Sequence, residues 1–252
     1  MRVLRALPEV AMWALIAITA IIDLAVYTHV VQGENASAHV RIGTTSGAST
    51  PGSGDPQSQA TVSAADRAER NDSESLPGRF VAPQGRQHTD AYPLRQHIPF
   101  CSEGGVSNEC YGSNPPTSGL HLPVQGNVRL ADGNRVKVPP DPGVYDFQIP
   151  REAIPHIEEH AGVYVGYHCT SDACNTTIGR LKDLVTQEVS LGARVVLSPD
   201  DDLDDNTIGA VAWTRIDTFD ASAYTDDRVR SFIKAHSCRF DPERFCSSPQ
   251  IN

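Results

Sequence analysis

The stretch that decides the fold is GVYVGYHCTSDACNTTIGRLKDLVTQEVSLGARVVL, residues 162–197. It begins with an apolar, strand-forming run over 162–168 and ends with a second such run over 193–197. Between the two runs, apolar residues recur at helical spacing on one face: Ile178, Leu181, Leu184 and Val185. We expect Asn175 or Thr176 to cap the N-terminus of this helix. The stretch therefore predicts a strand, a helix and a second strand.

Further elements are expected on both sides of this stretch. Residues 128–138 alternate in polarity around an Asp-Gly turn, which predicts a hairpin. A short helix is expected over 151–160, and another strand over 208–214. Thr225 precedes a last helix with acidic residues in its first turn. Since strands and helices mix without regular βαβ repetition, we predict an α+β fold, a single compact mixed domain.

The composition indicates that part of the chain lies outside this domain. Only 39% of the 252 residues are hydrophobic and 6% aromatic, which is low for one packed core. Residues 32–92 are rich in Ser, Gly, Thr, Ala and Pro, so they cannot bury enough surface to offset the entropy of ordering them. We therefore predict a disordered linker over 32–92 and an extracytoplasmic domain over 93–252.

The N-terminal segment, residues 1–31, predicts a membrane helix. Residues 10–31 are mostly apolar and, at about 1.5 Å per residue, long enough to cross a bilayer. Arg2 and Arg5 precede the run, which favours a cytoplasmic N-terminus. The alternative is a signal peptide cleaved near the Ala-Ser-Ala sequence at 36–38, which would release a secreted protein. Both interpretations place the domain outside the cytoplasm; the first predicts a single-pass protein of the cell membrane.

The net charge of −10 excludes one class of partner. Nucleic-acid phosphates require a basic surface, so we expect no nucleic acid to bind. The membrane is the predicted partner of the N-terminal helix, and the sequence identifies no protein partner.

All six cysteines lie in the predicted domain, in close pairs: Cys101 and Cys110, Cys169 and Cys174, Cys238 and Cys246. Six cysteines allow 15 pairings, of which nearest-neighbour pairing is the least demanding. Structural disulfides are favoured outside the cytoplasm, and the absence of a C-x-x-C sequence weakens redox and zinc-ribbon roles. Metal thiolates and reactive thiols stay as alternatives.

The first candidate for a functional site is the segment His156-Ile-Glu-Glu-His160. Two histidines four positions apart share one helix face and can chelate a metal ion. The pattern also reads as H-x-x-E-H, in which Glu159 would activate a metal-bound water. Pro155 and Gly162 leave little continuous helix around it, which is poor context for a protease. The alternative is that both histidines simply end a helix, where positive charge suits its dipole.

A second motif is Pro-Pro-Thr-Ser-Gly-Leu-His, ending at His121. Together with Gly-Val-Tyr at 143–145, the 156–160 segment and Ala-Trp at 212–213, it resembles the bacterial domain-of-unknown-function family numbered 3105. The resemblance covers about residues 97–246. One departure is Glu158, where the family usually has an apolar residue.

The resemblance implies a site but no established activity. Its motif positions are His121, His156, Glu159 and His160, a set that would suit a transition metal such as zinc or copper. We therefore expect a metal-binding domain. The alternatives are a metal-dependent hydrolase with Glu159 as general base, and a structural or partner-binding module without metal. The sequence leaves open whether the protein is an enzyme and favours binding.

Other candidates are weaker. The acidic run at 200–206 lacks the glycine and the final carboxylate of a calcium loop, so a solvated loop is expected. Ser118 lies outside any G-x-S-x-G sequence. His168 is expected to be a structural histidine at the end of a strand.

Overall fold

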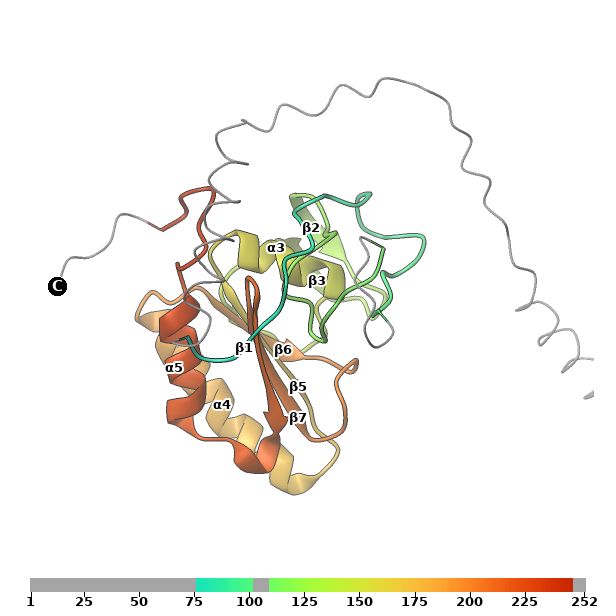
Figure 1. Ribbon diagram of the computed structural model, residues 1–252. Helices are drawn as coiled ribbons and strands as arrows, with labels where there is room; N and C mark the ends of the chain where they lie inside the picture. The colour runs from blue at the N-terminus through green and yellow to red at the C-terminus, as the bar shows by residue number, and fades with distance from the viewer. Residues whose placement is uncertain (1–75, 102–108, 247–252) are drawn as a thin grey trace, which may run out of the picture. The chain divides into compact units, whose positions relative to one another are not determined.

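The computed structural model describes residues 76–101 and 109–246 (Figure 1). The predicted membrane helix over 1–31, and the predicted linker as far as residue 75, lie outside the described residues. Within the described part of the chain, no helix combines the length and apolarity needed to cross a membrane.

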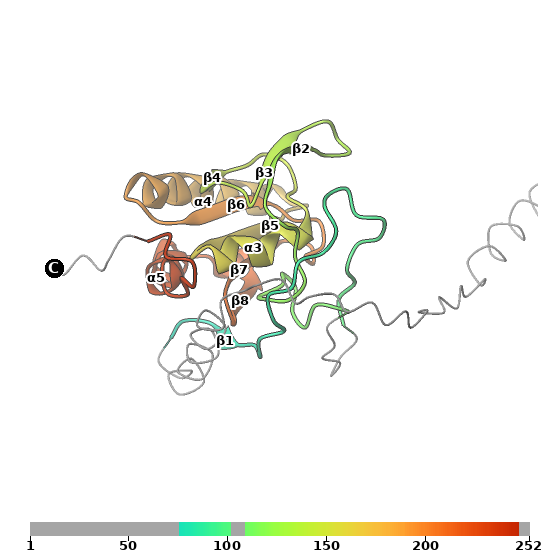
Figure 2. The same cartoon turned by 90° about the horizontal axis from the view of Figure 1, so that it is seen from above.

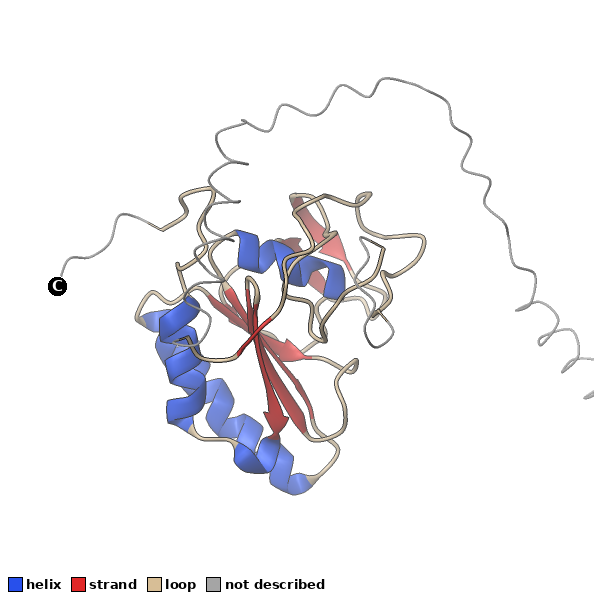
Figure 3. Cartoon of the chain, viewed as in Figure 1, coloured by secondary structure: helices blue, strands red, loops and turns tan. Residues whose placement is uncertain are grey.

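A six-stranded mixed sheet and three α-helices make up most of the domain (Figure 3). The strands are β1 (Arg79–Phe80), β2 (Gln125–Arg129), β3 (Arg135–Val138), β4 (Gly143–Val144), β5 (Val163–His168), β6 (Val195–Pro199), β7 (Thr207–Ala212) and β8 (Arg215–Asp220). The helices are η1 (Arg151–Ala153), α3 (Ile154–Glu159), α4 (Asp172–Ser190), η2 (Ala221–Ala223) and α5 (Asp226–His236). The sheet order is β1-β8-β7-β5-β6-β4, and β2 and β3 form a separate hairpin. The α+β prediction is confirmed.

The 162–197 stretch forms the centre of this sheet. β5 and β6 pair in parallel, and α4 connects them in a βαβ unit. β7 and β8 then continue antiparallel on the other side of β5. The strand predicted over 208–214 is shorter than expected. β7 ends at Ala212, and Thr214 has a φ of 63°, so the chain turns sharply there into β8.

The two faces of the sheet carry two cores, because successive strand residues point to opposite sides. Val163 and Val165 of β5 pack with Leu181 on the face that α4 and α5 cover. Tyr164 points the other way and packs with Ile157 of α3. Figure 2 shows α4 and α5 together on one side of the sheet. The functional candidates belong to the α3 side.

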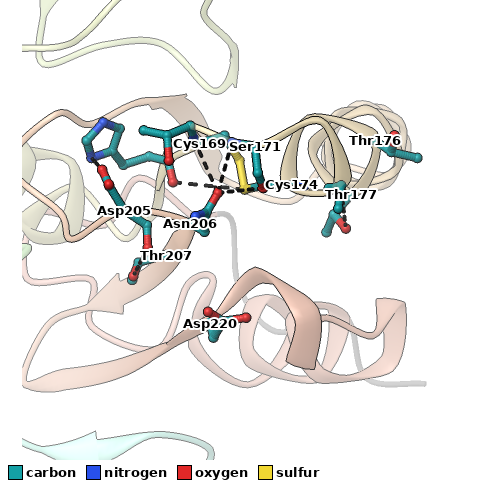
Figure 4. Close-up of a disulfide and its surroundings, with 12 residues drawn as sticks. Cys169, Ser171, Cys174, Thr176, Thr177, Asp205, Asn206, Thr207 and Asp220 are labelled. Atoms are coloured by element: carbon teal, nitrogen blue, oxygen red, sulfur yellow. Dashed lines mark hydrogen bonds and ion pairs between the residues drawn. A yellow bond between two sulfur atoms is a disulfide. The ribbon is translucent and has the colours of Figure 1, made fainter.

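The N-terminus of α4 lies earlier than predicted. Ser171 caps the helix, since its Oγ accepts a hydrogen bond from the Cys174 backbone N–H at 3.3 Å. Asn206 Oδ1 in turn accepts from the Ser171 Oγ–H at 2.8 Å and from the Ser171 N–H at 3.1 Å (Figure 4). Asn175 and Thr176 therefore lie inside the helix, and the expectation that one of them is the cap was wrong. The apolar face predicted for this helix is buried, as expected.

Residues 76–92 fall within the range predicted to be linker, yet they contact the domain. β1 pairs antiparallel with β8, and the Val81 N–H donates to the Thr214 carbonyl at 2.9 Å. Further along, His88 bridges to His121 in a parallel register. The folded unit therefore includes these residues, and His88 and Arg86 with them.

Three disulfides are present, with the nearest-neighbour pairing that the sequence favoured: Cys101–Cys110, Cys169–Cys174 and Cys238–Cys246. No cysteine of the chain is left free. Such bridges persist in oxidising surroundings, which indicates an extracytoplasmic location for the domain.

Candidate metal centre

The Pro-Pro-Thr-Ser-Gly motif acts as a rigid support for His121. Pro115 lies against Gly209 of β7, and the Thr117 carbonyl accepts from the Thr214 N–H at 3.1 Å. Ser118 is fully buried, and its Oγ accepts from the Gln84 N–H at 2.9 Å. That hydroxyl is therefore part of the scaffold. The segment ends with His121, whose side chain is fully buried.

His121 and His156 are oriented in the same way. The His121 Nδ1–H donates to the Gly119 carbonyl at 2.8 Å, and the His156 Nδ1–H donates to the Leu122 carbonyl at 2.6 Å. A carbonyl cannot donate, so Nδ1 carries a proton in both rings, and the neutral form of each ring keeps its lone pair on Nε2. Metal-ligating histidines are typically fixed by this kind of contact through their second nitrogen.

Helix α3 places Glu159 beside these two imidazoles. Glu159 Oε2 lies 2.8 Å from His121 Nε2, and the Arg86 guanidinium binds the other oxygen, Oε1, at 2.6 Å. Apart from this contact with each other, neither His121 Nε2 nor Glu159 Oε2 has a hydrogen-bond partner among the described residues. These two buried atoms therefore depend on each other, or on an ion between them, for a partner.

His88 completes a group of four possible ligands. One ligand atom from each of His88, His121, His156 and Glu159 lies within 4.8 Å of all the others. Three of the residues are buried and His88 is exposed, so the group is reached from solvent on the His88 side. Three imidazoles and one carboxylate match the donors of zinc and copper sites.

The structure brings together three of the four residues predicted from the sequence. His121, His156 and Glu159 belong to the group of four. His160 lies next to it, with its Nε2 3.0 Å from His156 Nε2. Sequence reasoning missed His88 because it assigned that residue to the linker. A usable signal was the pair Phe80-Val81, an apolar island in a polar stretch.

The electrostatics keep the imidazoles of His88, His156 and His160 neutral. Burial, together with the positive charges that His121 and His160 can carry, lowers the pKa of His156 to about 3. Burial likewise lowers the pKa of His160 to about 4 and lowers that of His88. A neutral imidazole is the form that binds a metal ion.

The carboxyl of Glu159 stays ionised. Burial raises its pKa, but the contact with His121 and the charge of Arg86 outweigh burial and leave the pKa below its usual range. A carboxylate with a lowered pKa is ionised and can act as a ligand, but it is a weaker base than an ordinary carboxylate. The geometry thus favours Glu159 as a ligand over Glu159 as a general base.

The comparison with protein families matches residues 107–248 to a family described as proteins of unknown function, DUF3105. The chain belongs to the DUF3105 family. The expected resemblance is therefore confirmed, and its range includes His121, His156, Glu159 and His160. His88 precedes the range of the DUF3105 match. No curated protein matches the chain significantly, and no solved structure does.

Gly209 tests whether the motif of this DUF3105 domain supports the site. A Cβ at Gly209 would lie 2.8 Å from Pro115 Cδ, so Gly209→Ala should push the motif outward. We expect a loss of about 1–3 kcal/mol in the free energy of unfolding, together with weaker metal binding, because His121 moves with the motif. Urea denaturation and a metal titration measure the two effects.

Gly179 provides the matched control. It lies in α4, where an added Cβ would meet no atom within 4 Å. Gly179→Ala should therefore stabilise the domain by about 0.5–1 kcal/mol, because alanine favours helix, and should leave metal binding unchanged. Equal stability of the Gly209→Ala variant and the wild type would contradict the supporting role of the motif.

Proposed function

We propose that this domain binds a transition metal ion, zinc or copper, through His88, His121, His156 and Glu159. One observation carries the proposal: two buried imidazoles donate Nδ1–H to backbone carbonyls, which leaves Nε2 of each as the ligand atom in a group whose four ligand atoms lie within 4.8 Å of one another. Apart from their mutual contact at 2.8 Å, His121 Nε2 and Glu159 Oε2 have no partner among the described residues. A metal ion satisfies both atoms at once.

Each residue has a distinct role in this proposal. The three imidazoles supply neutral nitrogen donors. Glu159 supplies Oε2, while Arg86 holds Oε1 and fixes the rotation of the carboxylate. Arg86 already forms an ion pair with Glu159, so the bound ion would add positive charge to the centre.

We also propose a cellular location for the domain and a means of its attachment. The three disulfides support an extracytoplasmic domain. Residues 1–31 would anchor it in the membrane, and the stretch before residue 76 would tether it there. We also propose that the domain binds no nucleic acid, in keeping with the net charge of −10.

The test is the metal content of the full chain, purified from an oxidising compartment, stripped with a chelator, reloaded with Zn²⁺ or Cu²⁺ and desalted. We expect one ion per chain in the wild type. His121→Asn and His156→Asn should bind no stoichiometric metal, because asparagine can keep the donor to the backbone carbonyl but lacks Nε2.

His168 offers the matched control. Its Nδ1–H also donates to a backbone carbonyl, that of Leu203, at 2.7 Å, but it lies at the end of β5 outside the group of four. His168→Asn should keep the full metal content. A wild type without metal after loading with both ions would refute the proposal and favour the polar cluster that pins the loop to the helix.

A further inference from the structure

The loop that follows α5 lies directly over His160. This cap loop, residues 238–246, is closed by the Cys238–Cys246 disulfide. The ring of Phe245 stacks on the His160 ring with centroids 4.1 Å apart and an angle of 26°. Glu243 Oε2 lies 3.4 Å from His160 Nε2. The cap loop therefore brings a second carboxylate to the edge of the proposed metal centre.

The cap loop is held in shape by several independent contacts. The ring of Phe240 stacks flat on Trp213, 4.4 Å away. The Asp241 carboxylate accepts from the Phe245 N–H at 2.7 Å and from the Cys246 N–H at 2.9 Å. At the start of the loop, the Cys238 N–H donates to the Ala161 carbonyl at 2.9 Å, next to α3. The position of Glu243 is thus built into the fold.

The charged groups that act on Glu243 include residues of the proposed metal centre. Burial raises the pKa of Glu243, and the negative charge of Glu159 raises it further, while Arg86 and His121 oppose both effects. Asp241 of the cap loop also raises the pKa of Glu243, and a second guanidinium, that of Arg194, donates to the His160 carbonyl at 2.8 Å. Three carboxylates with two guanidinium groups leave one excess negative charge beside the imidazoles. Such a group attracts a divalent cation.

We propose that Glu243 is a further ligand of the metal ion, delivered by the cap loop beside His160. This inference rests on the proposed function, because it adds a donor to the same centre. His160 links the two parts, since its Nε2 contacts His156 Nε2 at 3.0 Å as well as Glu243. The carboxylate oxygen of Glu243 and the imidazole of His160 add donors that zinc and copper accept.

The experiment uses Co²⁺ as a spectroscopic probe in the full chain, with Glu243→Gln as the main variant. Glutamine keeps the size of the side chain and removes its charge. We expect the visible Co²⁺ spectrum to change and the ion to pass to a competing chelator about 10- to 100-fold faster. The spectrum separates a ligand from a residue that only stabilises the loop.

The control is a carboxylate outside the centre. Asp204→Asn removes an exposed charge between β6 and β7, and both spectrum and rate should be unchanged. A double Cys238→Ser, Cys246→Ser variant should lose the ion faster, because the loop that carries Glu243 is no longer closed.

The outcomes are distinct. If Glu243→Gln shows the wild-type spectrum and a loss rate within about twofold of the wild type, Glu243 is not a ligand, while the metal centre itself stands. If the wild-type chain binds no Co²⁺, Zn²⁺ or Cu²⁺, the proposed function and this inference both fail.

Discussion

Between pH 7 and pH 5 the zinc affinity of the chain is expected to fall far less than it would with ordinary histidine ligands. Protons compete with the ion for each imidazole, so affinity falls only below the pKa of the free ligand. With an ordinary pKa of 6.5, each histidine would cost about 25-fold in affinity between pH 7 and pH 5, and two would cost several hundredfold. The pKa values of His156 and His160 are lowered to about 3 and about 4, so neither takes up a proton in this range.

Glu159 and His88 also stay in the form that binds a metal ion at pH 5. The pKa of Glu159 lies below its usual range, so this carboxylate stays ionised at pH 5, and the pKa of His88 is also lowered. Competition with a chelator of known zinc affinity, measured at both pH values, gives the ratio directly. A several-hundredfold loss at pH 5 would show that the imidazoles are not shielded as the structure indicates.

Trp213→Ala is expected to lower the free energy of unfolding by about 3–5 kcal/mol, among the largest effects of any single truncation. The indole is 2% exposed and stacks on Phe240, with the two ring planes 3° apart. Its removal leaves a cavity beneath the cap loop and frees that loop from its aromatic anchor. We therefore also expect faster release of the metal ion.

Trp213→Phe is the control, because it keeps an aromatic ring against Phe240 and should cost less than the alanine variant. Denaturation is best followed by far-ultraviolet circular dichroism, since the substitution removes one of only two tryptophans in the chain. If Trp213→Ala lowers the free energy of unfolding by less than about 1 kcal/mol, the neighbouring residues fill the cavity left by the indole, and the prediction is wrong.

The regular elements were largely predictable from the sequence. Apolar residues recur with the period of a strand or a helix because one face of each element is buried. Leu181 and Val185 of α4 and Val229 of α5 are buried, as their spacing predicts. The start of α4 was misplaced because its cap depends on a distant contact. Asn206 and the Cys169–Cys174 disulfide hold Ser171 in place. The sequence around Ser171 does not reveal its contact with Asn206.

The site was predictable only in part. His156 and Glu159 share a helix, so their spacing reveals them, and His121 follows a motif. His88 lies at the site because its segment pairs with the backbone around His121, and it carries no periodic signal. The orientation of each imidazole depends on the carbonyls of Gly119 and Leu122, which become neighbours only after folding.

The distance along the chain between the two sides of the centre has a thermodynamic consequence. Arg86 and Glu159 are 73 positions apart, and His88 lies in the same distant segment. An ion held by His88 and Glu159 would tie these segments together as a reversible cross-link. Closing a loop of that length restricts an unfolded chain by about 4 kcal/mol, comparable with a disulfide. The domain would then have a fourth cross-link besides its three disulfides, and this cross-link would form when the metal ion binds and break when it dissociates.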